Sequence, residues 1–149
     1  MKVAVASDHG GINTRGEIIS LLEQMGIEYV DFGCDCKASV DYPDYALPVA
    51  EKVASGEFDR GILICGTGIG MSIAANKVKG IRCALVHDVY SAKLTREHND
   101  SNMIAMGERV IGPGLACEIV KVWIQTEFSG QRHGARLDKI AEYEKSHLS

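Results

Sequence analysis

Five short apolar runs, separated by longer segments of helical pattern, constrain the fold of this chain most strongly. Two of the runs, KVAVAS at residues 2–7 and RGILIC at residues 60–65, are almost wholly apolar, as is typical of strands buried on both faces of a parallel sheet. Three more strands are predicted at IEYVDFG (27–33), IRCALV (81–86) and NMIAMG (102–107). A parallel sheet requires a crossover segment between each strand and the next.

The segments between these runs carry helical patterns. Apolar stripes end at Gly26 and Gly56, residues 91–98 and 114–128 continue the series, and a charged helix is predicted at 137–147. Strand and helix therefore alternate, which predicts right-handed crossovers covering both faces of the sheet. The predicted fold class is α/β, a three-layer, Rossmann-like, doubly wound sheet of parallel strands in the order 2-1-3-4-5, with an extra C-terminal helix.

Composition limits the domain organisation and the partners. The chain has 149 residues, of which 46% are hydrophobic, so a single domain spanning 1–149 is expected. Residues from about 130 to 149 are expected to form an arm that packs on another subunit. A net charge of −4 and a pI near 5.7 give no basic field, so neither nucleic acid nor a membrane surface is expected as a partner.

The five cysteines are an odd number without the spacing of a zinc finger, which favours a reducing, cytoplasmic location. The apolar run at the N-terminus is too short for a signal peptide or a membrane helix. Cys34 and Cys36 form a C-x-C pair without a second ligand pair, so we expect thiols rather than a metal site. No role is predicted for Cys83 or Cys117 beyond packing.

The segment ICGTGIGMS has a glycine at every second position, at residues 66, 68 and 70. Bare backbone N–H groups of such a loop can approach an anion closely. A dinucleotide site would require G-x-G-x-x-G, but Met71 occupies the position of the third glycine. An ATPase phosphate loop would require Lys followed by Ser or Thr, which is absent here. The remaining alternatives are a tight turn alone or a dedicated anion hole.

The predicted strand order opens a crevice at the carboxyl ends of the first and third strands. Asp8 and His9 follow the first strand, while Cys65 and Thr67 follow the third, so we expect these side chains to converge. A helix that begins near Gly70 would stabilise the thiolate form of Cys65. Cys65 is thus a candidate base, and the alternative is a small buried apolar side chain.

Further polar residues follow the later strands. His98 and Asn99 end a predicted helix, and Arg109 follows the last strand. Arg132 and Arg136 are four residues apart, so they share one helical face and can bind a phosphate together. Taken singly, each has a simpler explanation as a helix cap, an ion pair or a solvated charge. Taken jointly, they predict an anion-binding rim.

Several segments together resemble a known family. VAVASDHGG, DYPDYA, GILICGTGIGMSIAANK, HNDSN and GERVIG are similar to the B-type ribose-5-phosphate isomerases, which share a family with the subunits of galactose-6-phosphate isomerase. The resemblance covers nearly the whole chain. It implies reversible conversion of ribose 5-phosphate to ribulose 5-phosphate in the pentose phosphate pathway, without metal or organic cofactor. It also implies a homodimer, or a tetramer of paired dimers, whose sites combine residues of both subunits.

The resemblance also implies roles for individual residues. It makes Cys65 the base, His98 the group that opens the sugar ring, and Thr67 the hydroxyl that moves a proton between the substrate oxygens. The backbone from Gly66 to Gly70 corresponds to the anion hole. The implied substrate contacts are Asp8, His9, Tyr42, Gly66, Gly68, Ile69, Gly70, Asn99, Arg109, Arg132 and Arg136.

Two alternatives share this fold. One is an isomerase of another aldose phosphate, such as allose 6-phosphate or galactose 6-phosphate, with the same mechanism and a pocket of different depth. The other is a module that binds a phospho-sugar without converting it. The galactose-6-phosphate enzymes pair unlike subunits, one of which lacks the cysteine, so a chain with both Cys65 and His98 fits an enzyme that needs no unlike partner.

Overall fold

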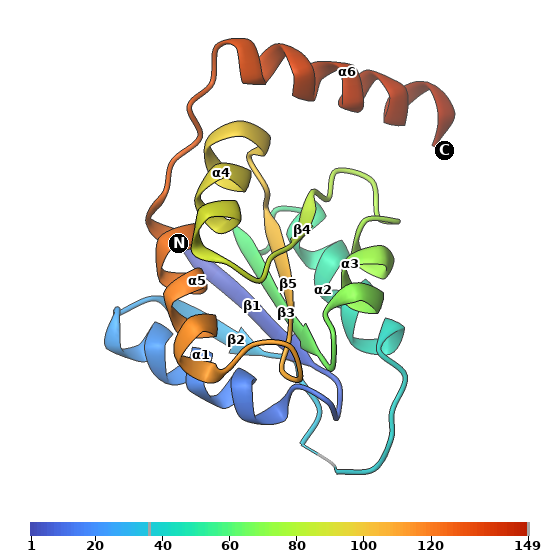
Figure 1. Cartoon of the computed structure of the whole chain (residues 1–149). Helices are drawn as coiled ribbons and strands as arrows, with labels where there is room; N and C mark the ends of the chain where they lie inside the picture. Colours follow the sequence, from blue (N-terminus) through green and yellow to red (C-terminus); the bar gives the residue numbers. More distant parts are fainter. Residues whose placement is uncertain (36, 149) are drawn as a thin grey trace.

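A computed structural model describes residues 1–35 and 37–148 of the chain. Strands and helices alternate along it, which confirms the predicted α/β class (Figure 1). The elements are β1 (Lys2–Ser7), α1 (Ile12–Gln24), β2 (Glu28–Asp31), α2 (Pro43–Ala54), β3 (Arg60–Cys65), α3 (Ile69–Ala75), β4 (Cys83–Leu85), α4 (Val89–Asn99), β5 (Met103–Gly107), α5 (Pro113–Gln125) and α6 (Arg132–His147).

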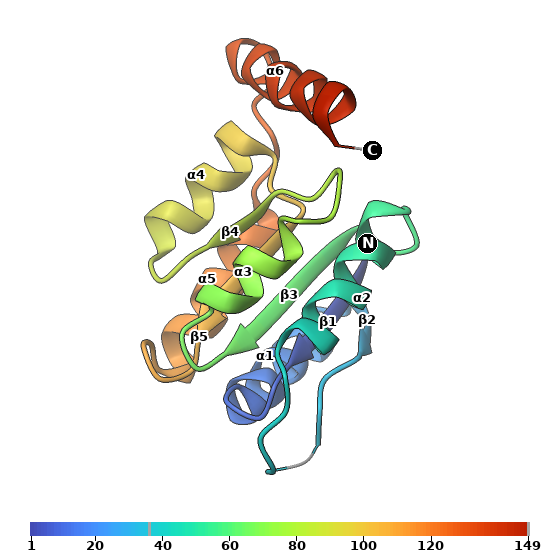
Figure 2. The ribbon, with the colours of Figure 1, turned by 90° about the vertical axis from the view of Figure 1, so that its right-hand side faces the viewer.

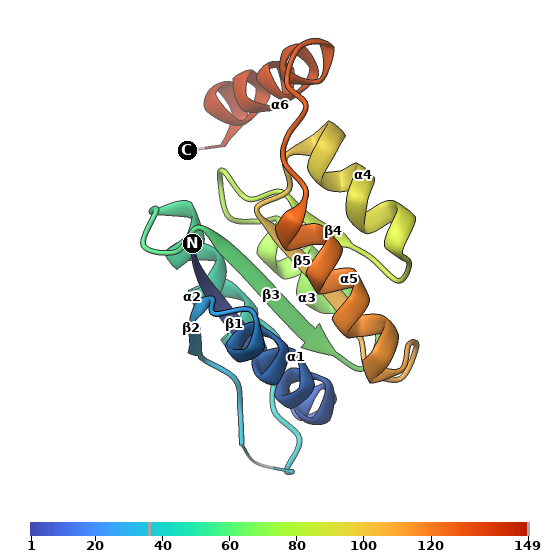
Figure 3. The ribbon, with the colours of Figure 1, turned by 90° about the vertical axis from the view of Figure 1, so that its left-hand side faces the viewer.

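The sheet is the middle of three layers. On one face it packs against α2 and α3 (Figure 2), and on the other against α1, α4 and α5 (Figure 3). Successive side chains of a strand point to opposite faces, so β1 contributes Val3 and Val5 to the core beneath α1 and α5, and Ala4 and Ala6 to the core beneath α2. Because both faces are covered, the central strands are apolar along most of their length, with Lys2 and Arg60 at their starts.

All strand pairs are parallel, and the strand order is β2-β1-β3-β5-β4. The predicted order 2-1-3-4-5 is therefore wrong for the last two strands. All five residues of β5 are buried, which suits a position between two neighbours, whereas β4 has three residues and leaves Leu85 exposed. A short, half-exposed strand is better tolerated at the edge of the sheet.

The return from β4 to β5 reverses the direction in which strands are added. Right-handed crossovers require the connecting helix to change face when this direction reverses. Accordingly, α3 packs with α2 on one face, while Ala92 of α4 packs with α5 on the other. The first reversal, between β1 and β3, is the one that was predicted from the sequence, and it opens a crevice at the carboxyl ends of these two strands.

The C-terminal helix α6 extends beyond the three layers, past the end of α4 (Figure 1). It begins at Arg132, earlier than the predicted start at residue 137, because Gly134 lies inside the helix rather than ending it. His133 is its one buried residue. Within residues 1–35 and 37–148, no helix is both long and apolar enough to span a membrane.

Candidate active site

The glycine loop and Cys65 form the centre of the candidate site. Cys65 is the last residue of β3, and its side chain is buried. The backbone N–H of Gly68 donates a hydrogen bond to Cys65 Sγ over 3.0 Å. Gly68 has a φ of +76°, in the left-handed region that favours glycine, and it precedes the first residue of α3. The loop thus turns back on itself and directs a backbone donor at the sulfur.

The loop that follows β1 lies against the glycine loop. The N–H of Gly10 donates to Asp8 Oδ1 over 2.8 Å, which orients this buried carboxylate. A Cβ at residue 10 would lie 3.0 Å from the backbone nitrogen of Gly66, so the two loops are in contact. The structure therefore brings Asp8 and Cys65 together at the carboxyl ends of β1 and β3. His9, also in this loop, accepts a hydrogen bond at Nδ1 from the N–H of Val40 over 3.1 Å.

Tyr42 and Arg109 complete this end of the sheet from other segments. A Cβ at Gly70 would lie 2.7 Å from Cζ of Tyr42, and a Cβ at Gly66 would lie 3.1 Å from the nearer terminal nitrogen of Arg109. The ring and the guanidinium therefore rest directly on the bare backbone of the loop. The backbone N–H of Arg109 donates a hydrogen bond to the carbonyl of Gly66 over 3.0 Å, which holds this residue beside the loop.

Two N–H groups of the loop already have acceptors inside the loop. The N–H of Gly68 bonds to Cys65 Sγ, and the N–H of Ile69 bonds to Thr67 Oγ1 over 3.3 Å. The side chains of Thr67 and Ile69 are exposed, so both point toward the outside of the loop. Thr67 is therefore an exposed residue at the carboxyl end of β3.

The other predicted residues lie at the opposite end of the strands, near the residues where β5 begins. His98 and Asn99 end α4 just before β5 begins, and Arg132 and Arg136 lie in the first turns of α6, which meets the end of α4 where His133 contacts His98. Cys65, by contrast, pairs with Gly107 at the far end of β5. Parallel strands rise about 3.3 Å per residue, so the five residues of β5 separate the two ends by about 13 Å. A single chain therefore does not unite His98 with Cys65.

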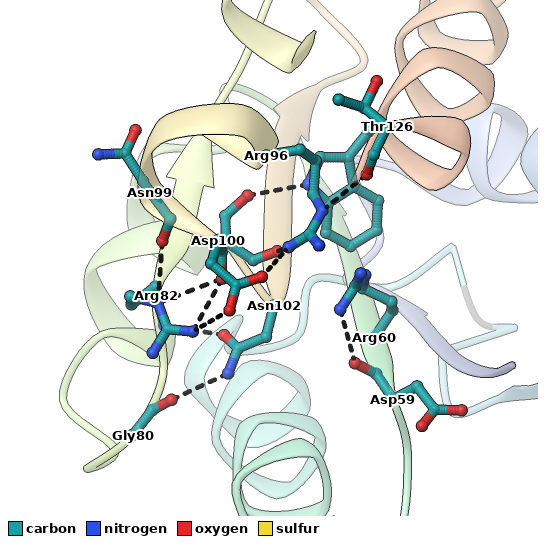
Figure 4. A network of polar contacts seen from close by, with 11 residues as sticks. Asp59, Arg60, Gly80, Arg82, Arg96, Asn99, Asp100, Asn102 and Thr126 are labelled. Atoms are coloured by element: carbon teal, nitrogen blue, oxygen red, sulfur yellow. Dashed lines mark hydrogen bonds and ion pairs between the residues drawn. The ribbon is translucent and has the colours of Figure 1, made fainter. Parts of the chain in front are cut away.

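A network that sequence reasoning missed holds the end of α4 (Figure 4). Arg96, which is buried, donates to Asp100 Oδ1 and to the carbonyl of Ser101, both over 2.7 Å. Arg82 donates to the carbonyl of Asp100 over 2.9 Å, and Trp123 Nε1 donates to Ser101 Oγ over 2.9 Å. Asp100 has a φ of +45°, as is common after the last turn of a helix. The polar run after residue 97 was the available signal, but two of its partners, Arg82 and Trp123, lie 18 and 22 residues away in the sequence.

Glu108 was missed as well. Gly11 at the start of α1 provides no side-chain cap, and Glu108 takes over this function from the end of β5. Its carboxylate accepts from the N–H of Thr14 over 2.7 Å and from Asn13 Nδ2 over 3.1 Å. The loops after β1 and β5 are thereby tied together beside the glycine loop.

Cys83 and Cys117 lie outside the candidate site. Burial raises the pKa of Cys83 to about 12, and burial, with Glu17 and Glu118 nearby, raises the pKa of Cys117. Both are therefore thiols at neutral pH. Cys34 is buried, and Cys36 lies outside the described residues. Among the residues that the structure describes, no group of three His, Cys, Asp or Glu side chains is arranged to hold a metal ion.

Comparison with known proteins identifies the family. A family model described as Ribose/Galactose Isomerase matches residues 3–140. The chain belongs to the ribose/galactose isomerase family. The resemblance inferred from the sequence is confirmed, and membership of this family makes the chain an enzyme of the isomerase class.

Individual relatives in the ribose/galactose isomerase family are similar along their whole length. Ribose-5-phosphate isomerase B of Escherichia coli (strain K12) is 46% identical over 144 residues, 97% of this chain and 97% of the relative. D-erythrulose-4-phosphate isomerase of Pectobacterium atrosepticum is 43% identical over 145 residues, 97% of this chain and 95% of the relative. The solved structure of Clostridium thermocellum ribose-5-phosphate isomerase B has a TM-score of 0.96 at 55% identity and covers 99% of both chains.

Proposed function

We propose that this chain interconverts ribose 5-phosphate and ribulose 5-phosphate through a cis-enediolate. The observation that carries the proposal is the position of Cys65 Sγ, which accepts a hydrogen bond from the N–H of Gly68. This sulfur lies at the crevice where Asp8, Tyr42 and Arg109 converge. The family, and relatives named for this reaction, support the same substrate. The reaction belongs to the pentose phosphate pathway and would take place in the cytoplasm.

Cys65 acts as the base in this scheme. A hydrogen bond from a backbone N–H stabilises a thiolate more than a thiol, because the bond is stronger to the charged form. The thiolate removes the proton from the carbon beside the carbonyl, the electrons move onto the carbonyl oxygen, and the thiol returns the proton to the neighbouring carbon. No oxidant or reductant is needed, since one carbon is oxidised as the other is reduced.

The glycine loop stabilises the enediolate. Its remaining N–H groups between Gly66 and Gly70 face the oxygen on which charge develops, where one donor is worth about 10²–10³ in rate. The exposed hydroxyl of Thr67 carries the proton from one substrate oxygen to the other. Asp8, held by Gly10, and Tyr42 bind sugar hydroxyls.

A second copy of the chain completes the site. Because His98 lies at the far edge of its own sheet, it reaches a Cys65 only in a neighbouring subunit, which supports a homodimer. Exposed apolar side chains on α3 and α6 supply a contact surface: Ile69 and Ile73 are 50% and 54% exposed, and Ile140 and Tyr143 are 52% and 61% exposed. In this arrangement α6 is the arm that packs on the partner, and paired dimers would form a tetramer.

The second copy opens the sugar ring and binds the phosphate. His98 takes the proton of the anomeric hydroxyl and protonates the ring oxygen as the bond between C1 and that oxygen breaks, so that no proton is gained or lost. Asn99 binds a sugar hydroxyl. Arg132 and Arg136 of this copy, with Arg109 and His9 of the first, bind the phosphate and orient the open chain.

The test of the base is Cys65→Ala, with Cys117→Ala as the matched control on α5. Cys65→Ala should lower conversion of ribose 5-phosphate by ~10²–10⁴-fold and stop exchange of solvent deuterium into the sugar, measured by NMR. Cys117→Ala should convert at the rate of the unchanged enzyme. Undiminished exchange in Cys65→Ala would refute the scheme, and binding without conversion by the unchanged enzyme would indicate a phospho-sugar-binding module instead.

The shared site is tested by mixing two inactive variants. Cys65→Ala and His98→Asn chains, refolded together, form mixed dimers in which one of the two sites has both residues intact. Random pairing should restore up to about one quarter of the activity of the unchanged enzyme. If the mixture stays inactive although mixed dimers form, then both residues act within one chain.

A panel of sugar phosphates tests the substrate. The family description and the relatives name galactose and erythrulose 4-phosphate as alternatives, and allose 6-phosphate is a third. Four-carbon aldose 4-phosphates cannot form a furanose, because the oxygen that would close the ring carries the phosphate, so they need no ring-opening group. The presence of His98 therefore favours a sugar that forms a ring. A higher kcat/KM for any other member of the panel would change the assigned substrate.

A further inference from the structure

His133 lies flat against His98. The two imidazole rings are stacked with centroids 4.1 Å apart and planes inclined by 11°. His98 belongs to the last turn of α4 and His133 to the first turn of α6, so the stack joins two elements that are far apart in the sequence. The side chain of His133 is 7% exposed, whereas no other residue of α6 is buried. This contact is therefore the point at which α6 buries a side chain against its own chain, while Glu144, further along α6, accepts a hydrogen bond from the N–H of Gly80 over 3.2 Å.

The backbone before α6 is shaped to make this contact. The N–H of Ser129 donates to the carbonyl of Glu97, the residue before His98, over 3.1 Å. Gly130 and Gln131 both have positive φ, at +67° and +51°, and the N–H of His133 then donates to the carbonyl of Gly130 over 3.1 Å. A positive φ at Gln131, with ψ at −124°, is unfavourable for a residue with a side chain. The turn accepts this conformation and sets His133 directly over His98.

We propose that His133 is a positioning residue for His98, holding that imidazole in one orientation for the opening of the sugar ring. The inference rests on the proposed function. A ring that transfers a proton between two substrate oxygens must keep both its plane and its position, and a flat neighbour restricts rotation about the bond that carries the ring. His133 itself is covered, so it acts through His98 and does not contact the substrate in this scheme.

The charges around the pair favour a neutral His133. Burial lowers the pKa of His133, and the neighbouring His98, Arg132 and Arg136 lower it further, while Glu97 acts in the opposite direction. An uncharged His133 ring can stack on His98 whether the His98 ring is neutral or protonated. A charged ring would repel His98 whenever that ring carried its proton.

The experiment separates ring opening from proton abstraction. Ribose 5-phosphate exists as a furanose and must be opened, whereas ribulose 5-phosphate has no free C5 hydroxyl and stays open. His133→Ala should lower kcat for ribose 5-phosphate by about tenfold or more, with little change in KM, because the phosphate-binding arginines remain. Exchange of solvent deuterium into C1 of ribulose 5-phosphate should change by less than about twofold, because that step uses Cys65 and the glycine loop and does not use His98.

His133→Phe is the matched variant, because it keeps a flat ring in the stack and removes the imidazole nitrogens. It should retain most of the kcat for ribose 5-phosphate that His133→Ala loses. NMR of the unliganded enzyme gives a readout without activity: the ring protons of His98 should shift in His133→Ala and keep their shielding from a stacked ring in His133→Phe. If His133→Ala also fails to fold, the comparison of His133→Phe with the unchanged enzyme still tests the stack.

Two outcomes would overturn the inference. One is equal loss of both reactions in a folded, dimeric His133→Ala, which indicates a general structural role. The other is failure of His133→Phe to restore ring opening, which indicates chemistry at the imidazole nitrogens. Failure of the proposed function itself has a different signature, since the unchanged enzyme would then neither convert ribose 5-phosphate nor exchange deuterium into ribulose 5-phosphate.

Discussion

Gly68→Ala should disrupt the glycine loop in a way that can be measured against a second glycine. Gly68 has a φ of +76°, and a left-handed conformation costs a residue with a Cβ about 1–2 kcal/mol. The new Cβ would also lie 2.7 Å from the carbonyl carbon of Met106 and 2.8 Å from Leu85 Cδ1. Because Met106 contacts it through backbone, the loop must move, and overpacking of this kind costs about 1–3 kcal/mol more.

Gly56→Ala is the control, since Gly56 has a φ of +81° and open space where its Cβ would lie. It should incur the cost of the backbone conformation alone, so the free energies of unfolding should differ between the two variants by about 1–3 kcal/mol. For a chain of this length the difference corresponds to about 2–12 °C in Tm, measured by differential scanning calorimetry.

Activity gives the second measurement on these two variants. A displaced loop removes the donor from Cys65 Sγ, so Gly68→Ala should lose isomerase activity, whereas Gly56→Ala should keep it. Equal stability of the two variants, with activity retained in both, would refute the argument that the loop packs on β5 without room for a side chain.

Three further predictions concern the rim of the site and its supports. Arg132→Ala should raise KM about tenfold or more and leave kcat nearly unchanged, whereas Lys145→Ala, at the other end of α6, should change neither; steady-state kinetics measures both. Glu108→Ala removes the acceptor of the Thr14 N–H and should lower stability by about 0.5–2 kcal/mol in denaturant titration. Because the pKa of His133 is lowered on folding, the unfolded chain binds a proton first as pH falls below about 6.5, so stability decreases with falling pH. His133→Phe should therefore lose less Tm than the unchanged protein between pH ~7.5 and ~5.5.

Much of the fold and half of the site follow from local patterns. The apolar runs at residues 2–7 and 60–65 correctly locate β1 and β3, and the residues that follow them, Asp8 and Cys65, meet at one edge of the sheet. The strand order could have been predicted better from the apolar composition of the last two strands. The run MIAMG of β5 has no polar residue, which favours a central position, whereas β4 begins directly after Arg82.

The sequence by itself determined the alternation of strands and helices, the glycine loop and the placement of Cys65 at a strand end. These features depend on side-chain periodicity and on the conformations that glycine permits, which act over a few residues. Only the tertiary structure decided that β5 lies between β3 and β4, that Arg82 pairs with Asp100, and that His133 covers His98 at the opposite end of β5 from Cys65. Contacts of this second kind join residues far apart in the chain, and they depend on how all the elements bury their apolar faces together.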